Sequence, residues 1–351
     1  MEAPGITIDL VSDTATRPSA AMFAAMAEAA LGDEQRDEDP TTTALCSRVA
    51  DLLGMEAAIF LPSGTMCNLI AFCVHCRPGD EIVCAANAHV FGSEAAGVAA
   101  VAGAQFRTIA SETGVFTATK AEALLRPPKL RAPRSRVILV EQTSNRGGGS
   151  IWPVEVLADL VELGRRSGVI LHMDGARLMN AAVASGVAPA TFVRGFDSAW
   201  LDLSKGLGCP VGGVLAGTRA FIEEAWVWKH RLGGAMRQSG VLAAAGLYAL
   251  DHNVARLADD HANARALAAR LGKLPGVSVF FQAPATNIVF IDVKETGLGT
   301  TEIAAGLSAA GVRMGVEDGH LLRAVTHLDV DRAGIDRAAD AFARIVGHAR
   351  A

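Results

Sequence analysis

The segment Asp202-Leu203-Ser204-Lys205-Gly206-Leu207-Gly208 directly follows an apolar, strand-like run over residues 197–201. Its lysine therefore lies near a strand end and leads into glycine, so no bulky neighbour crowds the amine. Thirty-one residues earlier (205 − 174), the segment His172-Met173-Asp174-Gly175-Ala176-Arg177 ends a second apolar strand. Each motif alone is more often a surface lysine or an Asp-Gly turn. Together they suit pyridoxal phosphate, because the lysine can form the Schiff base and the carboxylate can keep the pyridine nitrogen protonated.

Around these two motifs, apolar strands alternate with helical patterns, which is typical of an α/β fold with a mainly parallel sheet. An amphipathic helix is expected over 154–167 and an apolar helix from Met66 onward. The expected strands cover 57–61, 81–84, 105–109, 137–141, 169–173, 197–201 and 213–216. We therefore expect a large domain with a seven-stranded, mainly parallel sheet flanked by helices.

The pattern changes after the glycine-rich segment over 233–238. One long, alanine-rich helix is expected over 241–271, and a C-terminal helix from about Arg332. Short strands are expected over 277–281, 287–291 and 321–325. These patterns predict an N-terminal arm over 1–30 that contributes to the active site, a large domain over 31–245 and a small C-terminal α+β domain over 246–351.

The composition sets outer limits on function. Half of the 351 residues are hydrophobic and 20% are charged, with a net charge of −5, so a sizeable core is expected. No basic block or basic–aromatic stripe indicates a nucleic-acid partner. The N-terminus lacks a signal-peptide pattern, and apolar stretches such as 69–76 are shorter than the ~18–20 residues of a membrane span. We expect a cytoplasmic protein without a membrane partner.

Six cysteines in a chain of this size do not indicate a disulfide framework. The segment Cys73-Val74-His75-Cys76 resembles half of a zinc site, but no second Cys/His pair appears at suitable spacing. Because Cys73 and Cys76 stand three residues apart in an apolar helical stretch, we expect both thiols to pack as small hydrophobes. No metal is predicted.

The motif Ser63-Gly64-Thr65 lies between an expected strand and an expected helix, and we interpret it as a phosphate-binding turn. Glycine permits close approach, and a helix N-terminus offers N–H donors and a favourable dipole. Ordinary helix capping is the alternative for this motif. The absence of a following Gly-Lys-Ser/Thr argues against a P-loop. Arg237, after two glycines, could supply a phosphate-pairing cation, including from a neighbouring subunit.

Three further side chains are candidates for the same site. His89 could stack on a pyridine ring or act as a base near neutral pH, whereas Glu94 nearby carries less weight. Arg177, three residues after Asp174, could bind a carboxylate as a fork. Arg323 is a charge within the apolar strand pattern over 321–325, so it needs an anionic partner or lies on a solvated edge.

With these residues in place, the chain resembles the low-specificity threonine aldolases, pyridoxal-phosphate enzymes of the aspartate-aminotransferase-like fold, over almost its whole length. The motifs that carry the resemblance cover 9–18, 38–41, 61–65, 145–149, 174–177, 204–212, 236–238, 260–263 and 325–329. The resemblance implies cleavage of the Cα–Cβ bond of a β-hydroxy-α-amino acid to glycine and an aldehyde. It also implies dimers with shared active sites, paired into homotetramers.

The resemblance assigns roles to individual residues. Lys205 would be the Schiff-base lysine, Asp174 the partner of the pyridine nitrogen and His89 the ring-stacking imidazole, which is also our choice of base for the β-hydroxyl proton. Gly64 and Thr65 would hold the phosphate. Ser63, Ser204 and Arg237 are further candidate ligands of the cofactor, and so is Arg177. The substrate carboxylate would be bound by Ser12, Arg177 and Arg323.

Other reactions on the same fold stay open, since the cofactor residues serve many of them: a β-eliminating lyase, a transaldolase or an aminotransferase. A non-catalytic protein that retains the cofactor is a further alternative. The products distinguish an aldolase from these other reactions. An aldolase releases glycine and an aldehyde, whereas the alternatives release a keto acid with ammonia or an exchanged group.

The chain departs from the family pattern at two positions that border the expected pocket. Ser144 stands in the run over 141–145 where the family usually has histidine beside the substrate's β-hydroxyl, and serine cannot act as a base near pH 7. Arg36 precedes the run over 38–41 in place of the usual tyrosine. Ala235 replaces a third glycine, a smaller change. Two interpretations stay open. Either these positions have drifted without changing function, with Ser144 keeping a hydrogen bond, or the pocket now prefers a polar or acidic substrate.

Overall fold

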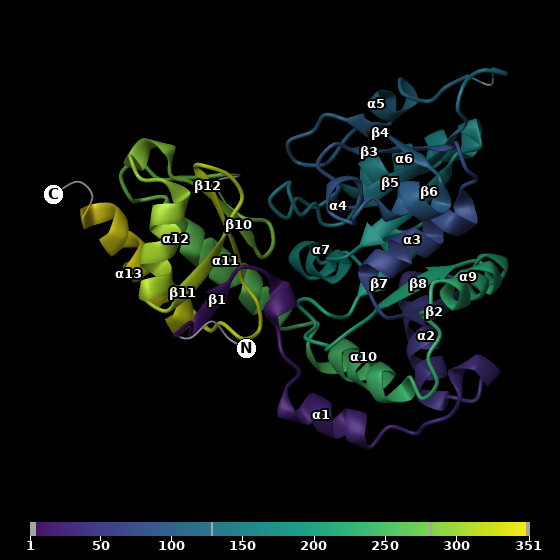
Figure 1. Cartoon of the computed structure of the whole chain (residues 1–351), viewed down its shortest axis with the longest axis horizontal. Coiled ribbons are helices and arrows are strands. Elements are labelled where there is room, and N and C mark those ends of the chain that lie inside the picture. Colours follow the sequence, from purple (N-terminus) through teal and green to yellow (C-terminus); the bar gives the residue numbers. More distant parts are fainter. Residues whose placement is uncertain (1–4, 128, 281–282, 349–351) are drawn as a thin grey trace. The chain divides into compact units, whose positions relative to one another are not determined.

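The computed structural model describes residues 5–127, 129–280 and 283–348, and the chain divides into two compact units (Figure 1). The large unit runs from Pro18 to Val254. The small unit combines the chain up to Arg17 with the chain from Ala255 onward. The sequence patterns suggested boundaries after residues 30 and 245, whereas the structure divides the chain after residues 17 and 254.

The large unit is built on a seven-stranded sheet of order β2-β8-β7-β6-β5-β3-β4. Only β8 runs against its neighbours β7 and β2; the other strands run in one direction. The strands are β2 (Ala57–Leu61), β3 (Glu81–Ala85), β4 (Gln105–Ile109), β5 (Ser135–Glu141), β6 (Ile170–Gly175), β7 (Ser198–Asp202) and β8 (Gly213–Gly217). The expected mainly parallel, seven-stranded sheet is confirmed.

Helices cover this sheet because its strands are apolar on both faces, as in other parallel sheets. Every residue of β3, β7 and β8 is buried. The helices are α1 (Ala20–Ala27), α2 (Pro40–Leu53), α3 (Gly64–His75), α4 (His89–Gly92), α5 (Ala118–Glu122), α6 (Val154–Ser167), α7 (Leu178–Ser185), α8 (Pro189–Phe192), α9 (Arg219–Arg231) and α10 (Gly240–His252). The bounds of α6 match the expectation.

The direction of the strands decides where side chains can meet. Because β2, β5, β6 and β7 run in parallel, their carboxyl ends lie at one edge of the sheet. The chain leaves these ends at Leu61, Glu141, Gly175 and Asp202. Ligands of open α/β sheets bind at this edge, so it is the place to look for the site.

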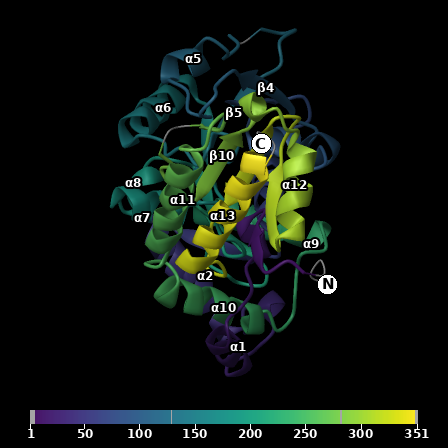
Figure 2. The same cartoon turned by 90° about the vertical axis from the view of Figure 1, so that its left-hand side faces the viewer.

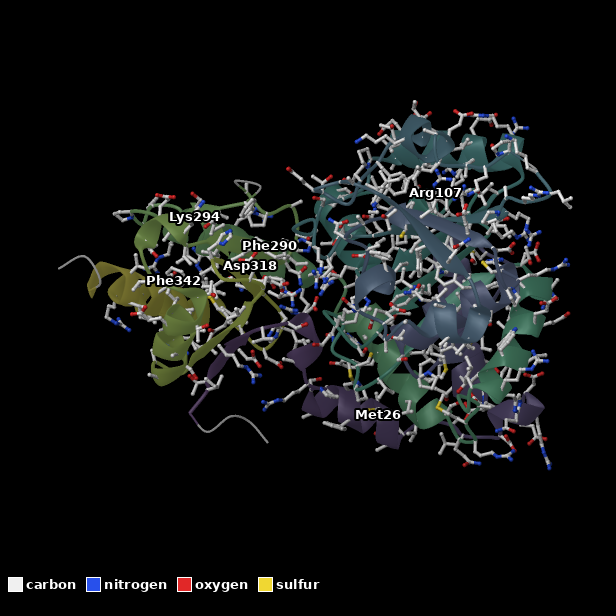
Figure 3. The ribbon with its side chains drawn as sticks, turned by 45° about the horizontal axis from the view of Figure 1, so that its top comes forward. Met26, Arg107, Phe290, Lys294, Asp318 and Phe342 are labelled. Carbon is white, nitrogen blue, oxygen red and sulfur yellow. The ribbon has the colours of Figure 1, made fainter. Side chains whose placement is uncertain are left out.

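The small unit has a five-stranded sheet of order β1-β11-β12-β10-β9, in which β1 runs parallel to β11. Its strands are β1 (Ile8–Leu10), β9 (Ser278–Val279), β10 (Ile288–Asp292), β11 (Val312–Val316) and β12 (Leu321–Val325). Helix α13 (Arg332–His348) packs on α11 (Leu257–Leu271) and α12 (Thr300–Ala309) (Figure 2). Phe342 of α13, labelled in Figure 3, is fully buried in the core of this unit.

The single helix expected over 241–271 is wrong. The structure has two helices, α10 and α11, separated by residues 253–256. Asn253 caps the end of α10 and its side chain donates to the carbonyl of Leu207 at 2.7 Å, which anchors this end to the loop after β7. The alanine-rich composition favours helix on both sides but does not show the break.

The small-unit strands over 287–291 and 321–325 and the C-terminal helix are confirmed, with a shift of one residue for β10. The strand expected over 277–281 is only two residues long in the structure, and residue 281 lies outside the described part. The sequence patterns missed β1 and β11. Strand β1 pairs with β11 across about three hundred residues of the chain, and β11 also pairs with β12.

The cysteine prediction is also confirmed. All six cysteines are free, and Cys73 and Cys76 pack in an apolar cluster with Phe72 and Ile82. Burial raises the pKa of Cys73 to about 11 and that of Cys76 to about 12, so both are inert thiols at neutral pH. Among the described residues no cluster of His, Cys, Asp and Glu could hold a metal ion. No described helix is long and apolar enough to cross a membrane.

Candidate active site

Lys205 lies in the loop that follows β7, as the sequence predicted. Its Nζ donates to Oδ2 of Asp202 at 2.7 Å and lies 5.7 Å from the centre of the Trp200 ring. The other carboxylate oxygen of Asp202 accepts from the backbone N–H and the hydroxyl of Ser204 at 2.6 and 3.0 Å. The Lys205 side chain is 20% exposed, so its amine is held in place and remains accessible.

Asp174 ends the neighbouring strand β6 and is only 2% exposed. Its Oδ2 accepts from the side-chain amide of Asn68 at 2.8 Å, and its Oδ1 accepts from the backbone N–H of Ala176 at 3.0 Å. Burial and the nearby carboxylates of Glu141 and Glu94 raise the pKa of Asp174 to about 7, against the Asn68 hydrogen bond and Lys205. Such a buried carboxylate gains most from a cationic partner, which fits a protonated pyridine nitrogen.

His89 lies beside two buried carboxylates. Its Nδ1 is 2.9 Å from Oε1 of Glu94, and its backbone N–H donates to Oε2 of Glu141 at 2.5 Å. Glu141 also accepts from the backbone N–H of Asn145 at 2.7 Å, so this one side chain fixes two loops. The hydrogen bond to Glu94 raises the pKa of His89, with burial opposing it and the charges of Asp174 and Glu141 adding to it. The imidazole is therefore a stronger base than a free histidine.

The predicted phosphate turn stands at the N-terminus of α3. The Ser63 hydroxyl caps this helix by accepting from the backbone N–H of Met66 at 3.2 Å. A Cβ on Gly64 would overlap with the Trp200 ring, so only glycine allows helix and strand to approach this closely. Ser63 and Thr65 are exposed, and the first N–H groups of a helix have no partner within it. The turn fits both capping and anion binding.

Arg177 and Ser144 come from the turns after β6 and β5. Arg177 is 5% exposed, and its Nη1 donates to Oδ1 of Asn145 at 3.5 Å. The Ser144 hydroxyl accepts from the backbone N–H of Gly147 at 3.2 Å and is 2% exposed. A Cβ on Gly114 would overlap with this hydroxyl, so Ser144 is enclosed by its own turn and by that glycine. The geometry fits a structural hydrogen bond.

Arg36 and Arg237 lie together on two exposed loops of the large unit. Both face Oδ2 of Asp33, Arg237 at 2.9 Å and Arg36 at 3.9 Å, and their side chains are 61% and 72% exposed. Beneath them the buried Glu34 accepts from Ser239 at 2.7 Å and pairs with the fully buried Lys229 at 2.8 Å. We call Arg36 and Arg237 the arginine pair.

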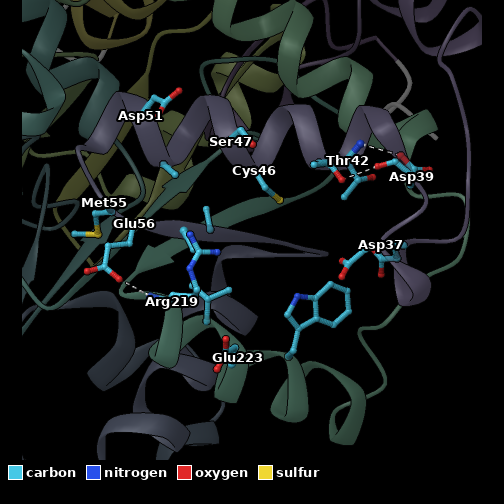
Figure 4. A pocket seen from close by; sticks show the side chains of 17 residues that line it. Asp37, Asp39, Thr42, Cys46, Ser47, Asp51, Met55, Glu56, Arg219 and Glu223 are labelled. Atoms are coloured by element: carbon cyan, nitrogen blue, oxygen red, sulfur yellow. Dashed lines mark hydrogen bonds between the residues drawn. The ribbon is translucent and has the colours of Figure 1, made fainter.

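A cavity of about 490 Å³ lies near these loops, between α2, β2 and α9 (Figure 4). Its lining includes Asp37, Asp39, Glu223 and Arg219, whose backbone N–H donates to Glu56 at 2.9 Å. None of the predicted site residues lines it.

Ser12 and Arg323 belong to the small unit and lie close to each other there. Nη2 of Arg323 donates to the carbonyl of Val11, next to Ser12, at 3.3 Å, and its Nε lies 3.2 Å from Glu317. The Ser12 hydroxyl accepts from the backbone N–H of Thr14 at 3.2 Å. Arg323 thus has an anionic partner, one of the two readings of its strand position.

Sequence reasoning missed Asn68 and Asp202 and gave Glu94 little weight. Asn68 is fully buried and joins Asp174 to Glu94, with its amide 3.0 Å from Glu94. Its signal was a single amide within an otherwise apolar helix. The signal of Asp202 was its position three residues before Lys205 at a strand end.

The sheet, the lysine after β7 and the buried aspartate near the end of β6 define a class, and the comparison with known families agrees with it. Residues 9–296 match the Beta-eliminating lyase family, and the chain belongs to that family. Within it, the chain is 41% identical to the low specificity L-threonine aldolase of Escherichia coli O157:H7 over 345 residues, 98% of each chain. It is 39% identical to the probable low-specificity L-threonine aldolase 2 of Arabidopsis thaliana over 344 residues, 97% of each.

Solved structures show the same fold. The Leishmania major threonine aldolase superposes with a TM-score of 0.83 at 20% identity, covering 97% of this chain and 99% of that one. The aspartate aminotransferase of Rhizobium meliloti superposes with a TM-score of 0.71 at 16% identity, covering 97% and 92%. The expected aspartate-aminotransferase-like fold is confirmed.

Proposed function

We propose that this chain is a pyridoxal-phosphate-dependent aldolase that cleaves the Cα–Cβ bond of threonine-like β-hydroxy-α-amino acids to glycine and an aldehyde. The observation that carries the proposal is the placement of Lys205 and the buried Asp174 at the ends of adjacent parallel strands. The likeness to threonine aldolases over nearly the whole chain supports the choice of reaction. When bound, pyridoxal phosphate supplies the electron sink for the breaking bond.

The residues at the strand ends fit this cofactor. Lys205 would carry it covalently, and the Asp174 carboxylate would pair with its ring nitrogen. His89 would lie against the ring. The phosphate would be bound by Ser63, Gly64, Thr65 and Ser204, with Arg237 as the cation. These donors match a phosphate at a helix N-terminus.

His89 is the proposed base for the β-hydroxyl proton. Its Nδ1 faces Glu94, so its Nε2 is the nitrogen that can accept a proton, and the side chain is 40% exposed. The raised pKa keeps the imidazole within the range useful near neutral pH. Ser144 does not compete for this role, because its hydroxyl is buried and accepts from Gly147.

Arg177, Ser12 and Arg323 are the proposed ligands of the substrate carboxylate. A guanidinium can hold a carboxylate through two parallel hydrogen bonds and so fix the orientation of the bond that breaks. Arg177 is buried among groups of the same edge, which supports the first of these assignments.

A homodimer with shared active sites, paired into a tetramer, is the proposed assembly. The support is the arginine pair, whose two guanidinium groups are exposed and so remain accessible to an anionic group of another subunit. Arg237 would bind the phosphate of the neighbouring subunit, and Arg36 would border its substrate.

The test is product release from both threonine diastereomers, phenylserine and β-hydroxyaspartate by the protein loaded with pyridoxal phosphate. Glycine and aldehyde in equal amounts support the aldolase. Ammonia with a keto acid would instead assign β-elimination, a reaction that the family's description also allows. Strong cleavage of β-hydroxyaspartate beside weak cleavage of threonine would show that Arg36 and Ser144 mark a redirected pocket.

A further inference from the structure

A chain of hydrogen bonds runs behind Asp174 into the core of the large unit. Asn68 donates from its amide nitrogen to Asp174 at 2.8 Å, and its amide oxygen faces Nε2 of His172 at 3.3 Å. Nδ1 of His172 lies 2.8 Å from the Ser198 hydroxyl, which lies 2.7 Å from Nε2 of His75. Asn68, His172 and Ser198 are fully buried, and His75 is 8% exposed.

The donor and acceptor groups at its two ends fix the direction of this row of hydrogen bonds. The amide nitrogen of Asn68 must face the carboxylates of Asp174 and Glu94, so its oxygen is the acceptor. That oxygen also accepts from the indole N–H of Trp200 at 2.8 Å, a group that can only donate. Nε2 of His172 therefore carries the hydrogen, and its Nδ1 accepts from Ser198.

The last two links follow in the same way. Because the Ser198 hydroxyl donates to His172, it must accept from Nε2–H of His75. Burial lowers the pKa of both histidines to about 3, so both rings stay neutral donors at neutral pH. His75 also stacks on Phe221 with ring centres 4.6 Å apart, which fixes the outer end.

We propose that Asn68 is a positioning residue for Asp174, and that His172, Ser198 and His75 form a hydrogen-bonded support that keeps the Asn68 amide turned toward the carboxylate. The inference rests on the proposed function, in which Asp174 pairs with the ring nitrogen of pyridoxal phosphate. Each member donates toward Asp174, so the chain favours an ionised, oriented carboxylate over a protonated one.

The need for such a support follows from the charges that face Asp174. The carboxyl groups of Glu94 and Glu141 oppose the charge of Asp174, Lys205 and His89 favour it, and Asp174 is buried. Two neighbouring carboxylates and burial favour a protonated Asp174, which could not hold a cationic ring nitrogen. The Asn68 amide, together with the backbone N–H of Ala176, is a neutral donor that opposes this without adding charge.

The experiment compares wild-type holoenzyme with Asn68→Asp and Ser198→Ala. Asn68→Asp keeps the shape but replaces the donor with an acceptor, whereas Ser198→Ala breaks the support and leaves Asn68 in place. Thr296→Val is the matched control, because it deletes a buried hydroxyl that donates to the carbonyl of Val293 in the small unit. The readouts are the dissociation constant of pyridoxal phosphate and the ¹⁵N shift of its labelled ring nitrogen.

We expect the dissociation constant to rise on the order of tenfold in Asn68→Asp, the effect of a lost hydrogen bond to a charged group, and less in Ser198→Ala. In both variants the ring-nitrogen shift should move toward that of the unprotonated ring, which a purely structural loss of stability would not produce. Thr296→Val should match the wild type in both readouts.

Wild-type values in Asn68→Asp and Ser198→Ala would overturn the positioning role while leaving the proposed function intact. If Asn68→Asp does not fold, Ser198→Ala decides alone. A wild-type protein that binds no pyridoxal phosphate would overturn the proposed function, and this inference with it.

Discussion

The carboxylates around Asp174 in the large unit are buried and hydrogen-bonded, whereas the guanidinium groups of the arginine pair are exposed. Asp174, Glu141 and Glu94 are 2%, 6% and 7% exposed, and hydrogen bonds hold each of them. Arg36 and Arg237 are 72% and 61% exposed and share the single carboxylate of Asp33. A change in the first region leaves a buried charge uncompensated, but a change in the second costs little, since exposed ion pairs contribute little to stability.

This difference suggests how one fold keeps its reaction while its substrate preference changes. The groups that we propose for the chemistry lie at or near strand ends, where packing and hydrogen bonds hold them. Arg36, which we propose borders the substrate, is exposed, and exposed segments accept a different side chain more readily. Mutations of the buried groups should therefore lower turnover, whereas mutation of Arg36 should alter selectivity.

The largest expected effect is that of Lys205→Ala. Removing the amine that we propose carries the cofactor should lower kcat for glycine release on the order of 10³-fold or more. Lys294→Ala, at an exposed lysine of the small unit labelled in Figure 3, is the control and should retain full activity. Substantial turnover by Lys205→Ala would remove this lysine from the mechanism.

Asp174→Asn should come next. It keeps the shape of the side chain but removes the charge that would stabilise a protonated ring nitrogen in the proposed site, so kcat should fall on the order of 10²-fold. Steady-state kinetics with threonine measure this, and circular dichroism shows whether the variant keeps its fold. A variant with wild-type kcat would mean that the ring nitrogen has another partner.

The pH profile tests the base. If His89 must be neutral to accept a proton, kcat/KM falls as the pH drops through its pKa, which Glu94 raises above the usual 6.5. Glu94→Gln removes the main cause, so the acid limb of the profile should move to lower pH. Glu162→Gln, at an exposed glutamate paired with Arg165, should leave the limb unmoved. If the acid limb does not move in Glu94→Gln, a group other than His89 acts as the base.

The smallest expected effect concerns selectivity. Arg36→Ala should lower kcat/KM for β-hydroxyaspartate about fivefold relative to threonine, the scale of one exposed charge pair. Arg48→Ala removes another exposed arginine, paired with Asp251, and should change neither substrate. Equal losses for both substrates in Arg36→Ala would end the idea that Arg36 selects an acidic side chain.

Much of the large unit could be predicted because its strands are continuous apolar runs, and the strand ends at Asp174 and Lys205 follow from them. The break at Asn253 could not, since alanine-rich sequence favours helix on both sides and the reason for the break is a contact with Leu207. Strand β1 was missed because three residues show no periodicity and its partner is distant in the chain.

The site was predicted where a residue type is diagnostic and missed where only packing gives it meaning. A lysine and an aspartate at two strand ends together indicate a cofactor, although neither motif does so alone. Asn68 is an ordinary amide in a helix until the fold brings it between Asp174, Glu94 and His172. Asp33, which brings the arginine pair together, has no signal in the sequence for the same reason.

The most direct test of the central claim is the stoichiometry of products from L-threonine, with glycine, acetaldehyde and ammonia measured in one reaction of the protein loaded with pyridoxal phosphate. The account predicts equal glycine and acetaldehyde, no ammonia, and loss of both products in Lys205→Ala. Ammonia with a keto acid in place of glycine would contradict it.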